Sequence, residues 1–82
     1  MTDTIRQFII QLLLEKGPLP SATPIGDYSY LDSGHIDSLA FIKFVFRLEE
    51  QFGIQLAESD IVSPRIRTVD GLAGLIAERL AH

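Results

Sequence analysis

Residues 34–53, which read GHIDSLAFIKFVFRLEEQFG, decide the fold of this chain. From Ser38 onward, apolar residues recur at steps of three and four, which is the spacing of one face of an α-helix. Gly53 follows the last of them, and glycine is the commonest residue just beyond a helix C-terminus. The stretch predicts a helix from Ser38 to Phe52, whose core-facing stripe consists of Phe41, Phe44, Val45, Leu48 and Phe52.

A second apolar stripe lies beside the first on the same predicted helix and consists of Leu39, Ile42 and Phe46. A helix with a polar outer face would not carry it. These side chains either pack beneath the preceding loop, against Tyr28 or Tyr30, or form a docking stripe for another protein. An exposed Phe is unfavourable unless a partner covers it. We therefore favour docking for Leu39 and Ile42 and leave Phe46 open.

Helical patterns also flank this central segment. The range Thr4 to Glu15 is periodic, and Gly17 and Pro18 then stop the helix. A short turn or helix is expected from Glu58 to Val62, and the last helix starts at Thr68 as N-cap, with Asp70 in its first turn. The expected buried positions are Ile5, Phe8, Ile9, Leu12 and Leu13 in the first helix, and Val69, Leu72, Ala73, Ile76 and Leu80 in the last.

The stretch from Leu19 to Asp37 is rich in Pro, Gly, Ser and Asp and predicts a long loop. Loops of this length in a small domain are usually functional or anchored by their own side chains. The pattern as a whole predicts an all-α fold over residues 1–82, a single-domain four-helix bundle of three main helices and one short one. Phe44, Leu48 and Phe52 should be buried with Ile9 and Ile76. The candidate anchors of the loop are Ile25, Tyr28, Tyr30, Leu31 and Ile36.

The composition excludes several classes of protein. A net charge of −4 with seven scattered basic residues argues against binding to nucleic acid, which needs clustered Lys and Arg. Cys is absent, so disulfides and thiolate metal sites are excluded. The apolar runs of the chain, such as residues 12–14, are far shorter than a bilayer span, and the N-terminus lacks the pattern of a signal peptide. We expect a cytoplasmic protein without membrane insertion.

The chain carries few groups suited to catalysis. His35 and His82 are its only imidazoles, and no paired-His metal motif or Gly-rich phosphate loop is present. Ser38, His35 and Asp37 are too close in sequence for one element to present a base to the hydroxyl of another. We therefore expect no catalytic residue and no metal ligand, with His35 as a loop residue near the main motif.

That motif is the junction at residues 34–39, where the long loop meets the strongest predicted helix. The simplest interpretation is capping, in which Asp37 or Ser38 accepts a hydrogen bond from a free N–H of the first turn. The tripeptide Asp37-Ser38-Leu39 by itself is a weak signal, since ordinary residue usage produces it by chance. Its weight comes from the surrounding pattern.

Residues 30–39 (YLDSGHIDSL), residues 48–54 (LEEQFGI) and the step Thr68-Val69 together resemble the acyl and peptidyl carrier protein family. Members have Asp-Ser-Leu or Asp-Ser-Met at the start of their second helix, followed by Leu-Glu-x-x-Phe-x-Ile. The resemblance covers nearly the whole chain. It implies that Ser38, next to Asp37, receives 4′-phosphopantetheine from coenzyme A through a separate transferase that uses magnesium.

The resemblance implies a non-catalytic carrier that holds an acyl or aminoacyl group as a thioester on this arm and presents it to biosynthetic enzymes. Its partners would be a phosphopantetheinyl transferase and an acyl- or aminoacyl-loading ligase, and we expect a freestanding monomer. A hydroxyl at a helix N-terminus suits this role, because the helix dipole favours the phosphodiester formed there. The rival interpretation is a helical interaction module that never receives the arm and binds through Leu39, Ile42 and Phe46.

Two features depart from the pattern of fatty-acid carriers. The spacing from Gly34 to Asp37 is one residue longer than in their Gly-x-Asp-Ser, and it is similar to D-alanyl-type and other specialised freestanding carriers. Lys43 and Arg47 lie where those carriers are usually acidic, which argues against a role in bulk fatty-acid synthesis. They are either part of a partner face or ordinary solvated side chains. The expected partner face consists of Leu39, Ile42, Lys43, Phe46 and Arg47.

Overall fold

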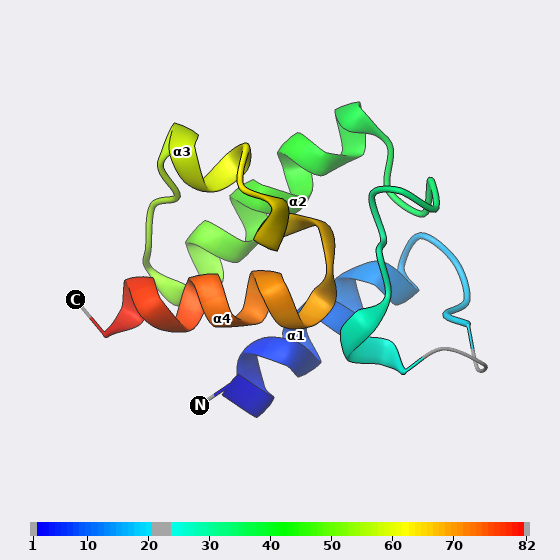
Figure 1. Cartoon of the computed structure of the whole chain (residues 1–82), viewed down its shortest axis with the longest axis horizontal. Helices are drawn as coiled ribbons and strands as arrows, with labels where there is room; N and C mark the ends of the chain where they lie inside the picture. Colours follow the sequence, from blue (N-terminus) through cyan, green and yellow to red (C-terminus); the bar gives the residue numbers. More distant parts are fainter. Residues whose placement is uncertain (1, 21–23, 82) are drawn as a thin grey trace.

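The structure is a computed structural model that describes residues 2–20 and 24–81. Figure 1 shows α2 and α3 above α4, with α1 below and behind it. Within the described ranges the chain forms helices and no strand, which confirms the predicted all-α bundle; Ser29 and Thr68 make one isolated bridge. The α-helices are α1 (Thr2–Leu14), α2 (Ser38–Phe52), α3 (Glu58–Ile61) and α4 (Val69–Leu80), and the 3₁₀-helices are η1 (Ile25–Asp27) and η2 (Pro64–Arg67).

The ends of α2 and the start of α4 are set by local sequence. The Asp37 side chain accepts a hydrogen bond from the Ala40 N–H at 2.8 Å and caps the N-terminus of α2. Gly53 ends the helix in the left-handed conformation, with φ 64° and ψ 35°, which glycine adopts without strain. Thr68 caps α4 by accepting from the Gly71 N–H at 3.1 Å. These three boundaries agree with the prediction.

The core is built from all the longer helices. Ile9, Phe44, Leu48 and Ile76 are buried as predicted, whereas Phe52 is only partly buried. Phe52 lies in the last turn of α2, where its ring packs edge-on against Phe8 with centroids 5.6 Å apart. The other side chains of the predicted stripes that are only partly buried are Phe8, Phe41, Val45 and Leu80.

The long connection between α1 and α2 runs along one end of the molecule, opposite the C-terminus (Figure 1). Its anchor is Tyr30, a fully buried side chain whose hydroxyl donates a hydrogen bond to the carbonyl of Ile66 in η2. Burial also raises the pKa of the Tyr30 hydroxyl. Ile36 is buried as well, and Ile25, Tyr28 and Leu31 are partly buried. Residues 24–37 of the connection are therefore packed against the bundle through the anchors that the sequence predicted.

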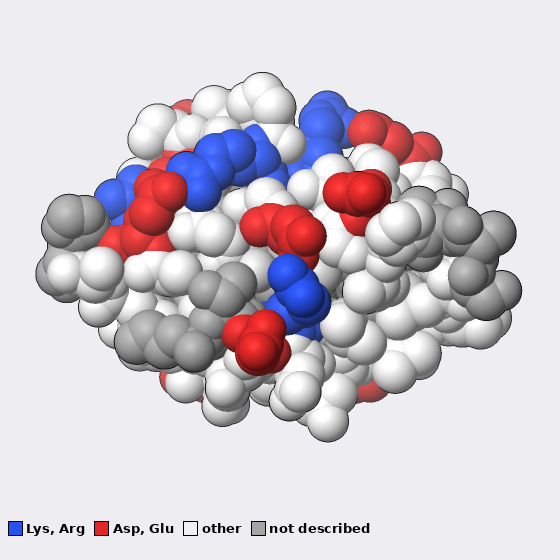
Figure 2. Space-filling view, turned by 60° about the horizontal axis from the view of Figure 1, so that its bottom comes forward, with Lys and Arg blue, Asp and Glu red and all other residues white. Residues whose placement is uncertain are grey.

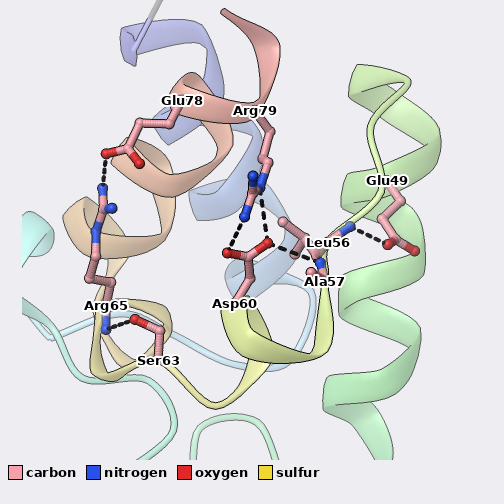
Figure 3. Close-up of polar contacts among 8 residues, drawn as sticks. All are labelled: Glu49, Leu56, Ala57, Asp60, Ser63, Arg65, Glu78 and Arg79. Atoms are coloured by element: carbon pink, nitrogen blue, oxygen red, sulfur yellow. Dashed lines mark hydrogen bonds and ion pairs between the residues drawn. The ribbon is translucent and has the colours of Figure 1, made fainter. Parts of the chain in front are cut away.

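Every arginine of the chain makes an ion pair. On the face in Figure 2, basic and acidic side chains lie next to one another and do not form a separate basic patch. Figure 3 shows two of these contacts, Arg65 with Glu78 and Arg79 with Asp60. Most of the pairs connect different elements, so they fix how the helices lie relative to one another. The remaining pairs are Arg6 with Asp70, Arg47 with Glu15, and Arg67 with Asp32.

Candidate functional site

Ser38 is the first residue of α2, and its side chain is exposed. The cap of this helix is Asp37, so the two capping alternatives left open by the sequence are now decided. The Ser38 hydroxyl makes no hydrogen bond to any part of the chain that the structure describes. It therefore lies at the positive end of the α2 dipole without a structural task of its own.

His35, three residues before Ser38, connects the long loop to α1. Its Nε2 lies 2.7 Å from the carbonyl oxygen of Leu13, and its Nδ1 lies 2.9 Å from the hydroxyl of Tyr28. Ser33 in turn donates a hydrogen bond to the Tyr28 hydroxyl at 2.9 Å. We call these four residues, Leu13, Tyr28, Ser33 and His35, the His35 clasp. Both ring nitrogens are engaged, so neither is free to take a proton from Ser38.

The stripe of Leu39, Ile42 and Phe46 faces solvent. Their exposed fractions are 78%, 57% and 60%, so the interpretation that they pack beneath the long loop is wrong. That interpretation fails because Tyr30 turns inward, where it packs on Phe44 at 5.3 Å between ring centroids. Val62, just after α3, is also 76% exposed, and the sequence analysis did not single it out. The stripe is thus accessible to another molecule, and docking remains a prediction.

An apolar groove lies between α2 and α3. It has a volume of about 290 Å³ and is lined by Phe41, Ile42, Val45, Phe46, Glu49, Leu56 and Ile61. The only charged side chain among them is Glu49, which accepts a hydrogen bond from the Leu56 N–H at 2.8 Å (Figure 3). Ser38, Ile42 and Phe46 follow one another at steps of four and so share one face of α2. The groove therefore begins about one turn from Ser38.

The two basic residues of the expected partner face have different surroundings. Arg47 pairs with Glu15, the residue just after α1, at 2.6 Å, and its hydrogen bond holds the pKa of that carboxyl below its ordinary value. Lys43 is exposed and makes no ion pair with any carboxylate that the structure describes. Sequence alone placed Lys43 and Arg47 together but could not show that Glu15, just after α1, already neutralises Arg47.

Two searches among known proteins bear on this site. The family described as "Phosphopantetheine attachment site" matches residues 7–76, which include Ser38 and its whole surroundings. An acyl carrier protein of Kineococcus radiotolerans is 27% identical over 70 residues, which cover 85% of this chain and 84% of that protein. No solved structure gives a significant match.

The matched region and the all-α fold agree with the expected carrier family. The family's cofactor is 4′-phosphopantetheine, which is attached covalently. An exposed hydroxyl at a helix N-terminus suits such an attachment, because the oxygen is accessible and the dipole favours the phosphate. Over residues 2–20 and 24–81, no helix is long and apolar enough to cross a bilayer. The chain belongs to the phosphopantetheine-binding family of acyl and peptidyl carrier proteins.

Proposed function

We propose that Ser38 is the attachment site and that the chain carries acyl groups as thioesters for biosynthetic enzymes. The observation that supports this proposal most is that the Ser38 hydroxyl is exposed at the start of α2. Asp37 caps the helix, so the Ser38 side chain is not needed as a cap. In the modification, Ser38 Oγ forms a bond to the phosphate next to the pantetheine of coenzyme A. The bond from that phosphate to the nucleotide half breaks, and the hydroxyl proton passes to the transferase. The bound arm supplies the thiol that holds the cargo.

The groove between α2 and α3 favours an apolar acyl cargo over an aminoacyl cargo. Six of its seven lining side chains are apolar, and the carboxylate of Glu49 is already hydrogen-bonded to the backbone. A free ammonium group would gain little there, since transfer of a charge to an apolar surface is unfavourable. A hydrocarbon chain would instead remove apolar surface from water.

The proposed partners are a phosphopantetheinyl transferase, an acyl-loading ligase and later enzymes of the pathway. They would dock on Leu39, Ile42, Lys43, Phe46 and Arg47, which lie within the first three turns of α2 after Ser38. Those turns carry basic residues and no acidic one, so a partner with acidic and apolar groups fits them. We further propose a monomeric, cytoplasmic carrier, whose net charge of −4 favours solubility.

The proposal is tested by intact-mass spectrometry after incubation with coenzyme A and a phosphopantetheinyl transferase of broad specificity. The wild type should gain the mass of one arm, and Ser38→Ala should gain none while keeping its helical circular-dichroism spectrum. Ser59→Ala, at an exposed serine of α3, is the matched control and should be modified like the wild type. A wild type that never gains the arm would instead favour the interaction module.

A further inference from the structure

The three residues that precede Ser38, residues 35–37, are each fixed by a contact with another part of the chain. His35 contacts α1 through the His35 clasp, and the side chain of Ile36 is buried in the core. The Ile36 N–H donates to the carbonyl of Tyr30 at 3.3 Å. Asp37 caps α2 through the Ala40 N–H, and its carbonyl accepts from the Phe41 N–H at 2.9 Å. The position of Ser38 therefore depends on contacts that are made before the helix begins.

The hydrogen bonds of the His35 clasp form one directed chain. A carbonyl oxygen can only accept, so the Nε2 of His35 carries a hydrogen and donates to Leu13. In the neutral ring Nδ1 then accepts from the Tyr28 hydroxyl, which itself accepts from Ser33. The acceptor at the end is the carbonyl of Leu13 in the last turn of α1, which also accepts from the Lys16 N–H at 3.0 Å. His35 thus adds a second, longer-range hydrogen bond to the end of α1 from a point next to the motif.

We propose that the His35 clasp is a positioning device for the attachment reaction, with His35 as its central residue. This inference rests on the proposed function of Ser38. The clasp fixes the loop against α1, and the loop fixes the first turn of α2, so the hydroxyl is presented in one place to the transferase. His35 acts through the backbone of residues 35–37 and not by contact with the reacting atoms.

A purely structural role would lower the stability of the chain without a specific effect on modification. A positioning role predicts a lower kcat of arm transfer with an unchanged KM for the carrier protein. The reason is that the proposed docking residues Leu39, Ile42, Lys43, Phe46 and Arg47 lie further along α2 and take no part in the hydrogen bonds of the clasp. Exchange of the Ile36 and Ala40 amide hydrogens reports on the order of the segment of residues 35–37, since Ile36 donates from it to Tyr30 and Ala40 donates to the Asp37 side chain.

Three variants and one control separate these possibilities. His35→Leu removes both ring nitrogens, and Tyr28→Phe removes only the hydroxyl at Nδ1. His35→Gln restores one donor and one acceptor on a single side chain and should rescue the function. Arg79→Gln removes an ion pair with Asp60 that is made from the C-terminal end of α4, and this end lies opposite the long connection (Figure 1). Each protein is compared with wild type at a temperature where circular dichroism shows it to be folded.

We expect His35→Leu, which loses two hydrogen bonds, to lower kcat at least about fivefold and to speed exchange at Ile36 and Ala40 by a similar factor. Tyr28→Phe should also lower kcat and speed exchange at these amides, but by a smaller factor. In His35→Gln, kcat and the exchange rates should lie within about twofold of the wild-type values. Arg79→Gln should leave kcat and these two amides unchanged. A His35→Leu protein with wild-type kcat, or an equal loss in Arg79→Gln, would overturn the proposal. A wild type that gains no arm would refute the proposed function itself, and the exchange data would still decide whether the clasp orders the segment.

Discussion

Asp37 and Ser38 are adjacent, but the first serves the fold and the second faces solvent. Because the carboxylate of Asp37 accepts the Ala40 N–H, the hydroxyl of Ser38 is not needed as a cap. Removal of a capping side chain costs about 1 kcal/mol, so Ser38 can be replaced or modified without that penalty. Because Asp37 makes the cap, a bulky group on Ser38 would leave the N-terminal cap of α2 intact.

Asp60 gives the first prediction at the residue scale. Two hydrogen bonds from Arg79, at 2.6 and 2.9 Å, and one from the Ala57 N–H hold the pKa of this carboxyl below its ordinary value (Figure 3). A carboxylate with a lowered pKa in the folded state contributes stability above its unfolded pKa, and this contribution is lost as the pH falls through the folded pKa. Asp60→Asn should therefore be less stable near neutral pH, by roughly 1–3 kcal/mol.

The measurement is the free energy of unfolding in urea between pH 7 and pH 3. The wild type should lose more stability over this range than Asp60→Asn, so the two curves should approach each other in acid. Parallel curves would mean that the Arg79 contact does not favour the ionised carboxyl. Asp27→Asn, at an exposed residue of η1, is the matched control and should follow the wild type.

At the scale of elements, the sequence predicted the helix boundaries and caps that depend on residues close together in the chain. The bounds of α2, its Gly53 terminus and the Thr68 cap were all predicted, because periodicity and capping act within a few residues. The contacts that join elements were not predicted: His35 to Leu13, Arg47 to Glu15 and Tyr30 to Ile66 span 22, 32 and 36 residues. Residue type alone does not specify such pairs, since each depends on how the helices pack.

The basic face of α2 gives the prediction at this scale. Reversal of both Lys43 and Arg47 to Glu would place two further carboxylates near Glu15. Because Arg47 is already paired with Glu15, this change would affect folding stability as well as docking. Lys43 alone is therefore the better probe. If a partner with acidic groups binds this face, Lys43→Gln should slow loading by the cognate enzyme roughly three- to tenfold at low salt.

The control for this test is Gln55→Glu, an exposed position that follows α2 and lowers the net charge by the same unit. Loading rates of fully modified proteins should be compared at low and high ionic strength, because salt screens exposed charges. The two variants should differ at low salt and converge at high salt. Equal rates throughout would make Lys43 an ordinary solvated side chain and shift attention to Leu39 and Ile42.

For the whole molecule, a small core lies beneath an exposed apolar stripe on α2. The buried set includes Leu48, at 0% exposure, while Leu39 on the same helix is 78% exposed. A domain of this size has little stability to lose, so core and surface positions should respond very differently to truncation. The fold class was predictable because helical periodicity recurs in three long segments of the chain, which together imply a helical bundle.

Leu48→Ala should therefore lower the free energy of unfolding by roughly 2–5 kcal/mol, through lost burial and the cavity left behind. Leu39→Ala, the same change on the same helix, should stay within about 0.5 kcal/mol of wild type. Urea melts with equal midpoints for the two variants would contradict the placement of the inner and outer faces of α2.

The central claim is that Ser38 carries the arm, and peptide mapping of the modified chain tests it most directly. After treatment with coenzyme A and a transferase, the protein is digested and its peptides are fragmented in a mass spectrometer. The account predicts one phosphopantetheine group, located on Ser38 and on none of the other serines. Modification at Ser33, Ser59 or any other residue, or an unmodified Ser38 in a chain that gains the arm, would contradict it.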